Sequence, residues 1–132
     1  MRIYLDAAPV IYLVEQVSPF ASEVSSRLSQ SSVVLIASDL TKMECLVKPL
    51  RDQDTALLED YRIHFNEATD ELVSLTSEVV DRATSIRAHH GFGVADAIHL
   101  AAALVSGCDL FLTNDRRLAA FKDIEVEVLS VS

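Results

Sequence analysis

Glycine and proline are scarce in this sequence, with three residues of each, and tryptophan is absent. Few glycines and prolines predict short loops between regular elements. With only 6% aromatic residues, an extensive platform for stacking nucleic-acid bases is not expected. No apolar run reaches the ~18–20 residues that a membrane-spanning helix needs, so we expect no membrane association. A signal peptide is not expected either, because Asp6 interrupts the first apolar segment.

Cysteine is also sparse, with two residues, and their positions indicate the redox environment and the kind of metal site to expect. Cys45 and Cys108 both lie among apolar residues, and their separation matches no zinc-binding pattern. The sequence therefore predicts reduced cysteines in the core of a cytoplasmic protein.

Basic residues are outnumbered, with 11 Lys and Arg against 20 Asp and Glu, for a net charge of −9. This balance argues against a surface that coats nucleic acid, which usually requires a basic face. It does not exclude nucleic acid as a substrate, because a divalent cation and a few local arginines can hold phosphates on an acidic protein. An excess of acids is also what a metal site or a basic partner would require.

Half of the 132 residues are hydrophobic, which is enough for one domain covering residues 1–132. Apolar, β-branched runs predict strands, and segments with apolar residues at helical spacing predict helices between them. The expected strands are residues 2–6, 33–37, 71–76, 109–113 and 124–129, the last alternating like an edge strand. The expected helices are residues 8–16, 18–30, 38–50, 52–66, 77–89 and 94–106, with a short one at 115–121. This alternation predicts an α/β fold, a three-layer α/β/α sandwich with a mostly parallel central sheet.

Ligands bind beyond the carboxyl ends of the strands in such sheets, and three acids stand out there, with a fourth at the start of a helix. Asp6 ends the first strand, and Asp115 lies just past the fourth. Glu44 lies in the first turns of the helix after the second strand, and Asp96 in the first turn of the helix before the fourth. If the first and fourth strands are neighbours, Asp6 and Asp115 lie close together at one edge.

Each acid also has a purely structural interpretation. Glu44 follows Thr41 at the spacing of a capping box. Asp115 or Asn114 could cap the next helix, and Asp96 could complement a helix dipole. Asp6 is the hardest to explain in this way, because Ala7, Ala8 and Pro9 follow it and offer no polar partner in the sequence.

A shared site for these acids restricts the chemistry. Two carboxylates ~5 Å apart repel by roughly 3 kcal/mol at an effective dielectric of ~20, so four need protons or a cation. Oxygen ligands without cysteine or histidine favour Mg²⁺ or Mn²⁺ over zinc. The natural reaction is metal-assisted hydrolysis of a phosphodiester.

Three segments, RIYLDAAPVIYLVE, SDLTKMECLVKPL and GVADAIHLAAALVSGCDLFLTNDRRL, contain these acids in order. Together they resemble PIN-domain ribonucleases, specifically the VapC-type toxins of type II toxin–antitoxin systems, over essentially the whole chain. The resemblance implies an endoribonuclease in which Asp6, Glu44, Asp96 and Asp115 coordinate Mg²⁺ or Mn²⁺ and cleave RNA. It also implies a cognate antitoxin protein and a homodimer as partners.

The resemblance also bears on the neighbours of the acids. Thr113 and Asn114 match the family pattern and are expected to orient Asp115 or a water molecule. Family members often carry Thr or Ser and Asn after the first aspartate, where this chain has Ala7, Ala8 and Pro9. Three arginines near the acids are candidates for holding RNA phosphates, with solvated surface as the alternative; they are Arg87, Arg116 and Arg117.

Other residues are expected to serve mainly structure. His99, three residues after Asp96, is expected to pack between helices, although it could touch substrate. Tyr12, Leu13 and Phe20 lie on the first two predicted helices. If exposed, they would suit an antitoxin helix or a dimer interface.

Two rival functions remain open at this point. A receiver-like signalling domain, phosphorylated on an aspartate, has a similar size and class. It expects paired acids after the first strand and a lysine after the last, and neither is present. The other rival is a catalytically inactive PIN domain that only binds a partner.

Overall fold

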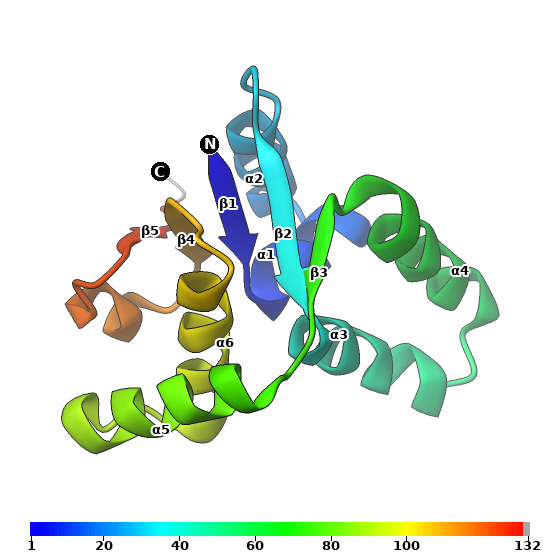
Figure 1. Cartoon of the computed structure of the whole chain (residues 1–132). Coiled ribbons are helices and arrows are strands. Elements are labelled where there is room, and N and C mark those ends of the chain that lie inside the picture. Colours follow the sequence, from blue (N-terminus) through cyan, green and yellow to red (C-terminus); the bar gives the residue numbers. More distant parts are fainter. Residues whose placement is uncertain (131–132) are drawn as a thin grey trace.

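The computed structural model describes residues 1–130 and is built around one parallel five-stranded sheet (Figure 1). The strands are β1 (Arg2–Leu5), β2 (Val34–Ser38), β3 (Glu71–Val73), β4 (Leu110–Thr113) and β5 (Glu125–Val128). Their order is β3-β2-β1-β4-β5, and every neighbouring pair is parallel. The three-layer α/β/α fold is therefore confirmed, with β5 at an edge.

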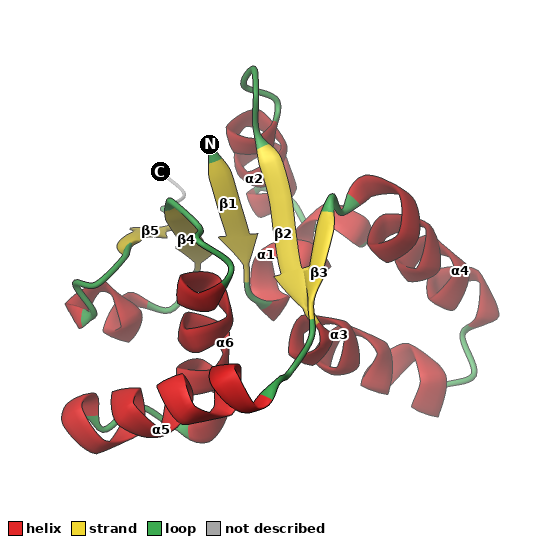
Figure 2. Ribbon diagram, viewed as in Figure 1, coloured by secondary structure: helices red, strands yellow, loops and turns green. Residues whose placement is uncertain are grey.

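Helices connect the parallel strands and cover both faces of the sheet (Figure 2). They are α1 (Ala7–Val14), α2 (Phe20–Leu28), α3 (Asp39–Arg51), α4 (Thr55–Ile63), α5 (Ser77–His90) and α6 (Val94–Val105). Two shorter elements complete the chain, a π-helical turn η1 (His64–Ala68) and a 3-10 helix η2 (Arg116–Ala120). Among residues 1–130, no helix is long and apolar enough to cross a membrane.

The two-residue period of the strands sorts their side chains between two cores. In β1, Tyr4 faces the core under α5 and α6, while Ile3 and Leu5 face the core under α1 to α4. In β4, Phe111 lies on the Tyr4 side, and its ring stacks on Tyr4 with centroids 5.2 Å apart. Both faces of the central strands are thus buried, as a parallel sheet requires.

Most predicted elements are present, and the differences at their ends have local causes. The strand expected at 71–76 ends at Val73, because Thr76 caps α5 by accepting a hydrogen bond from the Val79 N–H. The helix expected at 52–66 starts only at Thr55, because Asp54 caps it by accepting from the Leu57 N–H. Its last turn widens into η1, and the short helix expected at 115–121 is the 3-10 helix η2.

The strand order excludes the receiver-like alternative. Receiver domains have the order 2-1-3-4-5, with the third strand beside the first. Here the chain runs outward from β1 to β2 and β3, then returns to place β4 on the other side of β1. The order therefore reverses between β1 and β4, and the carboxyl edge of these two strands is where such folds bind ligands.

Candidate active site

Asp6 lies at this reversal point, beside the end of β4. Leu5 is paired with Leu112, so the next residue in each strand, Asp6 and Thr113, are neighbours across the sheet. The Thr113 hydroxyl donates a 2.6 Å hydrogen bond to Oδ2 of Asp6. The other carboxylate oxygen, Oδ1, is buried and has no hydrogen-bond partner among residues 1–130. The polar partner that the sequence around Asp6 lacks thus comes from another strand, and it satisfies only half of the carboxylate.

Burial raises the pKa of Asp6 to about 6. The hydrogen bond from Thr113 and the nearby imidazole of His99 oppose this rise, whereas the charges of Glu44 and Asp96 add to it. These mutual influences show that the acids from β1, α3 and α6 lie within electrostatic range of one another.

Asp115 reaches the same edge through Thr113. The Thr113 hydroxyl accepts a 3.1 Å hydrogen bond from the Asp115 N–H, while Oδ1 of Asp115 accepts from the Arg117 N–H at 3.0 Å. Asp115 is therefore the cap of η2, as one of the structural interpretations predicted. A capping role does not exclude a second one, because Oδ2 takes no part in the cap.

Arg117 bridges two of the acids. Its side chain donates to both oxygens of Asp115, at 3.0 and 2.5 Å, and to Oδ2 of Asp96 at 3.4 Å. These bonds hold the pKa of Asp115 below its usual range. Burial raises the pKa of Asp96, and repulsion from Asp115 adds to this despite the attraction of Arg117. Arg117 was predicted as a phosphate contact, and in the structure its guanidinium already neutralises part of the acidic cluster.

Glu44 extends towards the acids from α3. The alternative interpretation, in which Glu44 forms a capping box with Thr41, is wrong. Ser38 caps α3: its side chain accepts from the Thr41 N–H, and Thr41 accepts from the Ser38 N–H. Glu44 is thereby left out of the cap. Its Oε1 lies 2.6 Å from Nε2 of His99 on α6.

His99 is the residue whose importance the sequence understated. Its side chain is only 3% exposed, and Nδ1 lies 2.7 Å from the hydroxyl of Tyr4. The expectation of a helix-packing histidine is confirmed by this burial, but both ring nitrogens also have polar partners. The available signal was the spacing of three residues from Asp96, which puts both side chains on one face of α6.

The remaining predicted residues lie around this cluster. Asn114 donates from Nδ2 to the hydroxyl of Tyr12 at 2.5 Å, so it links the β4 end to α1. Arg87 donates to the carbonyl of Phe92 at 3.1 Å. Within residues 1–130, no hydrogen bond or ion pair joins Arg87 or Arg116 to the four acids.

The donor set suits a hydrated divalent cation better than a closed metal cage. Within the described part of the chain, no three His, Cys, Asp or Glu side chains form a ready-made ligand group. Arg117 engages Asp96 and Asp115, and His99 engages Glu44. Mg²⁺ keeps several waters and needs only one or two carboxylates. The buried, unpartnered Oδ1 of Asp6 is the kind of oxygen such a cation would satisfy.

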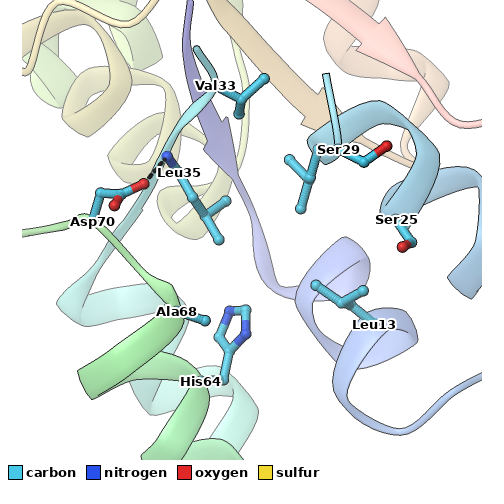
Figure 3. A pocket seen from close by; sticks show the side chains of 9 residues that line it. Leu13, Ser25, Ser29, Val33, Leu35, His64, Ala68 and Asp70 are labelled. Carbon is cyan, nitrogen blue, oxygen red and sulfur yellow. Dashed lines mark hydrogen bonds between the residues drawn. The ribbon is translucent and has the colours of Figure 1, made fainter. Parts of the chain in front are cut away.

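A separate hollow lies away from the acids, between the α1–α2 pair and η1 (Figure 3). We call it the α2 groove; it has a volume of about 390 Å³, and its lining includes Leu13, Ser25, Leu35, His64 and Asp70. His64 points into the α2 groove, and its Nε2 is buried without a hydrogen-bond partner in the described residues. Burial lowers the pKa of this imidazole, so the groove favours its neutral form.

An exposed apolar stripe runs along α3, on the far side of the helix from its core contacts. It consists of Met43, Val47 and Leu50, which are 58%, 53% and 66% exposed. Their spacing of four and three residues puts them on one helix face. We call these residues the α3 stripe.

Comparison with known proteins gives the family. The model of the PIN domain family matches residues 3–124. A comparison with curated proteins finds no match.

Solved structures share the fold at low sequence identity. A chain of the VapBC2 complex of Rickettsia felis, bound to promoter DNA, superposes with a TM-score of 0.77 at 10% identity, covering 97% of this chain and 98% of the other. A chain of VapBC-1 from Haemophilus influenzae gives 0.74 at 16% identity, with coverage of 97% and 98%. VapC20 of Mycobacterium tuberculosis, a sarcin–ricin loop cleaving toxin, gives 0.67 at 14% identity, with coverage of 83% and 86%. Because the family match spans nearly the whole sequence, this chain belongs to the PIN domain family.

Proposed function

We propose that this protein is a Mg²⁺- or Mn²⁺-dependent endoribonuclease that acts as the toxin of a toxin–antitoxin pair. The observation that carries the proposal is the half-satisfied, buried carboxylate of Asp6 at the edge where the strand order reverses. Such a carboxylate is costly unless a cation or a proton joins it. The VapC20 toxin and the VapBC proteins that share the fold supply the biological context.

In this mechanism Asp6, Glu44, Asp96 and Asp115 would hold the cation, some of them through its bound waters. A divalent cation at such a site supplies Lewis-acid chemistry, acidifying a water molecule and stabilising charge on the phosphate oxygens. Thr113 fixes the orientation of Asp6 through its 2.6 Å hydrogen bond. Asn114 anchors the end of β4 through Tyr12.

The arginines supply positive charge for the substrate. Arg117 is 75% exposed, so its guanidinium can leave Asp115 and Asp96 at little cost and bind an RNA phosphate. Arg116 and Arg87 are proposed as weaker phosphate contacts further from the acids. In an otherwise acidic chain, these local charges offset the repulsion between RNA and the protein surface.

Expression of the protein with and without the product of the neighbouring open reading frame tests the toxin function. Induction alone should arrest growth and produce RNA fragments with defined ends, and co-expression should suppress both. Unchanged growth and intact RNA would leave the inactive, partner-binding PIN domain as the better description. Cellular RNA as substrate requires a cytoplasmic location, which fractionation of the same cultures checks.

The α2 groove is the proposed docking site for the antitoxin. The wall of the groove is mainly apolar, with the unpartnered imidazole of His64 and the carboxylate of Asp70 as polar features. An amphipathic segment with one hydrogen-bond donor or hydroxyl would bury its apolar face there and satisfy His64.

Replacing Ser25 with arginine should weaken the complex with the antitoxin at least tenfold, measured by calorimetry or pull-down. Ser25 is exposed and lines the α2 groove, so a long charged side chain blocks the groove without a folding cost. The matched control is Ser26→Arg at the next position of α2, which is also exposed but does not line the groove. If both variants bind the antitoxin equally well, the antitoxin binds a surface other than the α2 groove.

The α3 stripe is proposed as the homodimer surface, because exposed apolar residues on one helix face favour burial against a second copy. Val47→Lys should keep the protein monomeric at concentrations where the wild type is dimeric, as measured by light scattering after gel filtration. Leu75→Lys changes an exposed leucine outside α3 and is the control. A dimeric Val47→Lys protein would exclude the stripe as the interface.

A further inference from the structure

His99 is a nearly fully buried polar residue beside the acids, and both of its ring nitrogens have polar partners. Its side chain is 3% exposed, and it lies one turn after Asp96 on α6. Nε2 lies 2.6 Å from Oε1 of Glu44, and Nδ1 lies 2.7 Å from the hydroxyl of Tyr4. For a histidine to donate to a carboxylate in this contact, the proton must be on Nε2.

Tyr4 continues the network into the strands. Its hydroxyl lies 2.8 Å from Oγ of Ser38 and 3.4 Å from Oγ1 of Thr41. Thr41 in turn donates to the carbonyl of Leu5 at 3.3 Å, directly before Asp6. The network therefore connects β1, the end of β2, the start of α3 and the first turns of α6. Asp6 directly follows β1, while α3 and α6 carry Glu44 and Asp96.

We propose that His99 is the positioning residue of Glu44: its imidazole, held by Tyr4, fixes one oxygen of the Glu44 carboxylate so that the other faces the cation. This inference rests on the proposed function. A glutamate side chain has three rotatable bonds, and ordering it on cation binding costs conformational entropy. The contact with His99 orders the Glu44 side chain when the protein folds. The entropy cost is therefore not charged against cation binding, and the cation binds a carboxylate already in place.

The exposure of Glu44 supports this role over simple core packing. Its side chain is 32% exposed, and Oε2 accepts no hydrogen bond from the described residues. One oxygen is thus bound to the buried network while the other remains available. A residue that only filled this volume could be apolar and would leave no polar group to satisfy, whereas the imidazole links the Glu44 carboxylate to the buried hydroxyl of Tyr4.

Two substitutions at one position separate positioning from packing. His99→Leu fills the volume but removes the donor, and we expect Mn²⁺ affinity, measured by calorimetry, to fall ~10–100-fold. His99→Gln retains an amide donor that can reach Glu44, and it should recover most of that loss. Tyr4→Phe removes only the hydroxyl that holds the imidazole and should weaken Mn²⁺ binding by a smaller factor than His99→Leu.

The control is Tyr61→Phe, which removes a different buried hydroxyl, bonded to Glu15 outside the site. It should leave Mn²⁺ affinity unchanged, while a general loss of core hydrogen bonding would lower affinity in both tyrosine variants. RNA cleavage by His99→Leu should show a reduced kcat and a higher Mn²⁺ requirement, with KM for RNA unchanged, because the imidazole touches no part of the substrate.

The outcomes separate this inference from the proposed function. If His99→Leu binds Mn²⁺ as the wild type does, or if His99→Gln binds as weakly as His99→Leu, the positioning role is wrong even when RNA is cleaved. If the wild type binds Mn²⁺ and the variants follow the expected order without any RNA cleavage, the positioning role stands and the nuclease function fails. A wild type that binds no Mn²⁺ overturns both.

Discussion

Replacing Asp6 with asparagine is expected to abolish RNA cleavage and, without added cation, to stabilise the folded protein at pH 7. The pKa of Asp6 is about 6 in the folded protein, mainly because of burial, against ~3.9 when unfolded. Folding is therefore penalised at any pH where Asp6 is ionised in the unfolded chain. The penalty is absent below pH ~4, develops between pH ~4 and about 6, and is complete above that, at ~1–3 kcal/mol. Asparagine avoids it, although its amide must take the position of the unpartnered Oδ1.

Urea unfolding in the presence of a chelator, at pH 4.5 and pH 7, measures this effect. The advantage of Asp6→Asn should be clear at pH 7 and small at pH 4.5. Asp115→Asn is the matched comparison: it should also abolish cleavage, but it loses the pairing with Arg117 and should lower stability by up to ~1 kcal/mol. Full cleavage by the Asp6→Asn protein would rule out the mechanism, and destabilisation at pH 7 would contradict the electrostatic account of Asp6.

Removal of divalent cations should have the second large effect, on activity and stability together. A chelator should reduce cleavage to background, and Mg²⁺ or Mn²⁺ should restore it. A cation at 100 times its Kd stabilises the folded state by ~2.7 kcal/mol, which raises the melting temperature by several degrees. The rise should be smaller at pH 5 than at pH 7, because the proton of Asp6 must leave before the cation binds.

Thermal melts with and without Mn²⁺ at both pH values test this expectation. The net charge of −9 allows weak cation binding elsewhere on the surface, so the specific part is the difference from Asp6→Asn. Asp81→Asn, which removes an exposed acid on α5, should respond to Mn²⁺ as the wild type does. Equal melting shifts in all three proteins would show that the cation binds non-specifically.

The sequence predicted the fold because its signals are local. Continuous apolar, β-branched runs, separated by segments with helical spacing, indicate strands buried on both faces. The alternation of side chains along such a strand then places Tyr4 on the opposite face from Ile3 and Leu5. Element ends were less certain, because a single capping side chain decides them. Thr76 caps α5, so β3 ends before it. Ser38 caps α3, whereas the sequence had suggested a capping box of Thr41 and Glu44.

The clustering of acids at one edge also follows from the sequence, because all carboxyl ends of a parallel sheet lie on the same side. What each acid contacts was decided only by the tertiary structure. The partners of Asp6 and Glu44 are Thr113 and His99, separated from them by 107 and 55 residues. Periodicity tells which face a side chain lies on, but contacts across the sheet depend on strand order and helix rotation. For that reason the sequence by itself determined a parallel α/β sheet with acids at its carboxyl edge. Only the folded chain decided that Asp6 keeps an unpartnered oxygen, that His99 holds Glu44 and that Arg117 neutralises Asp96 and Asp115.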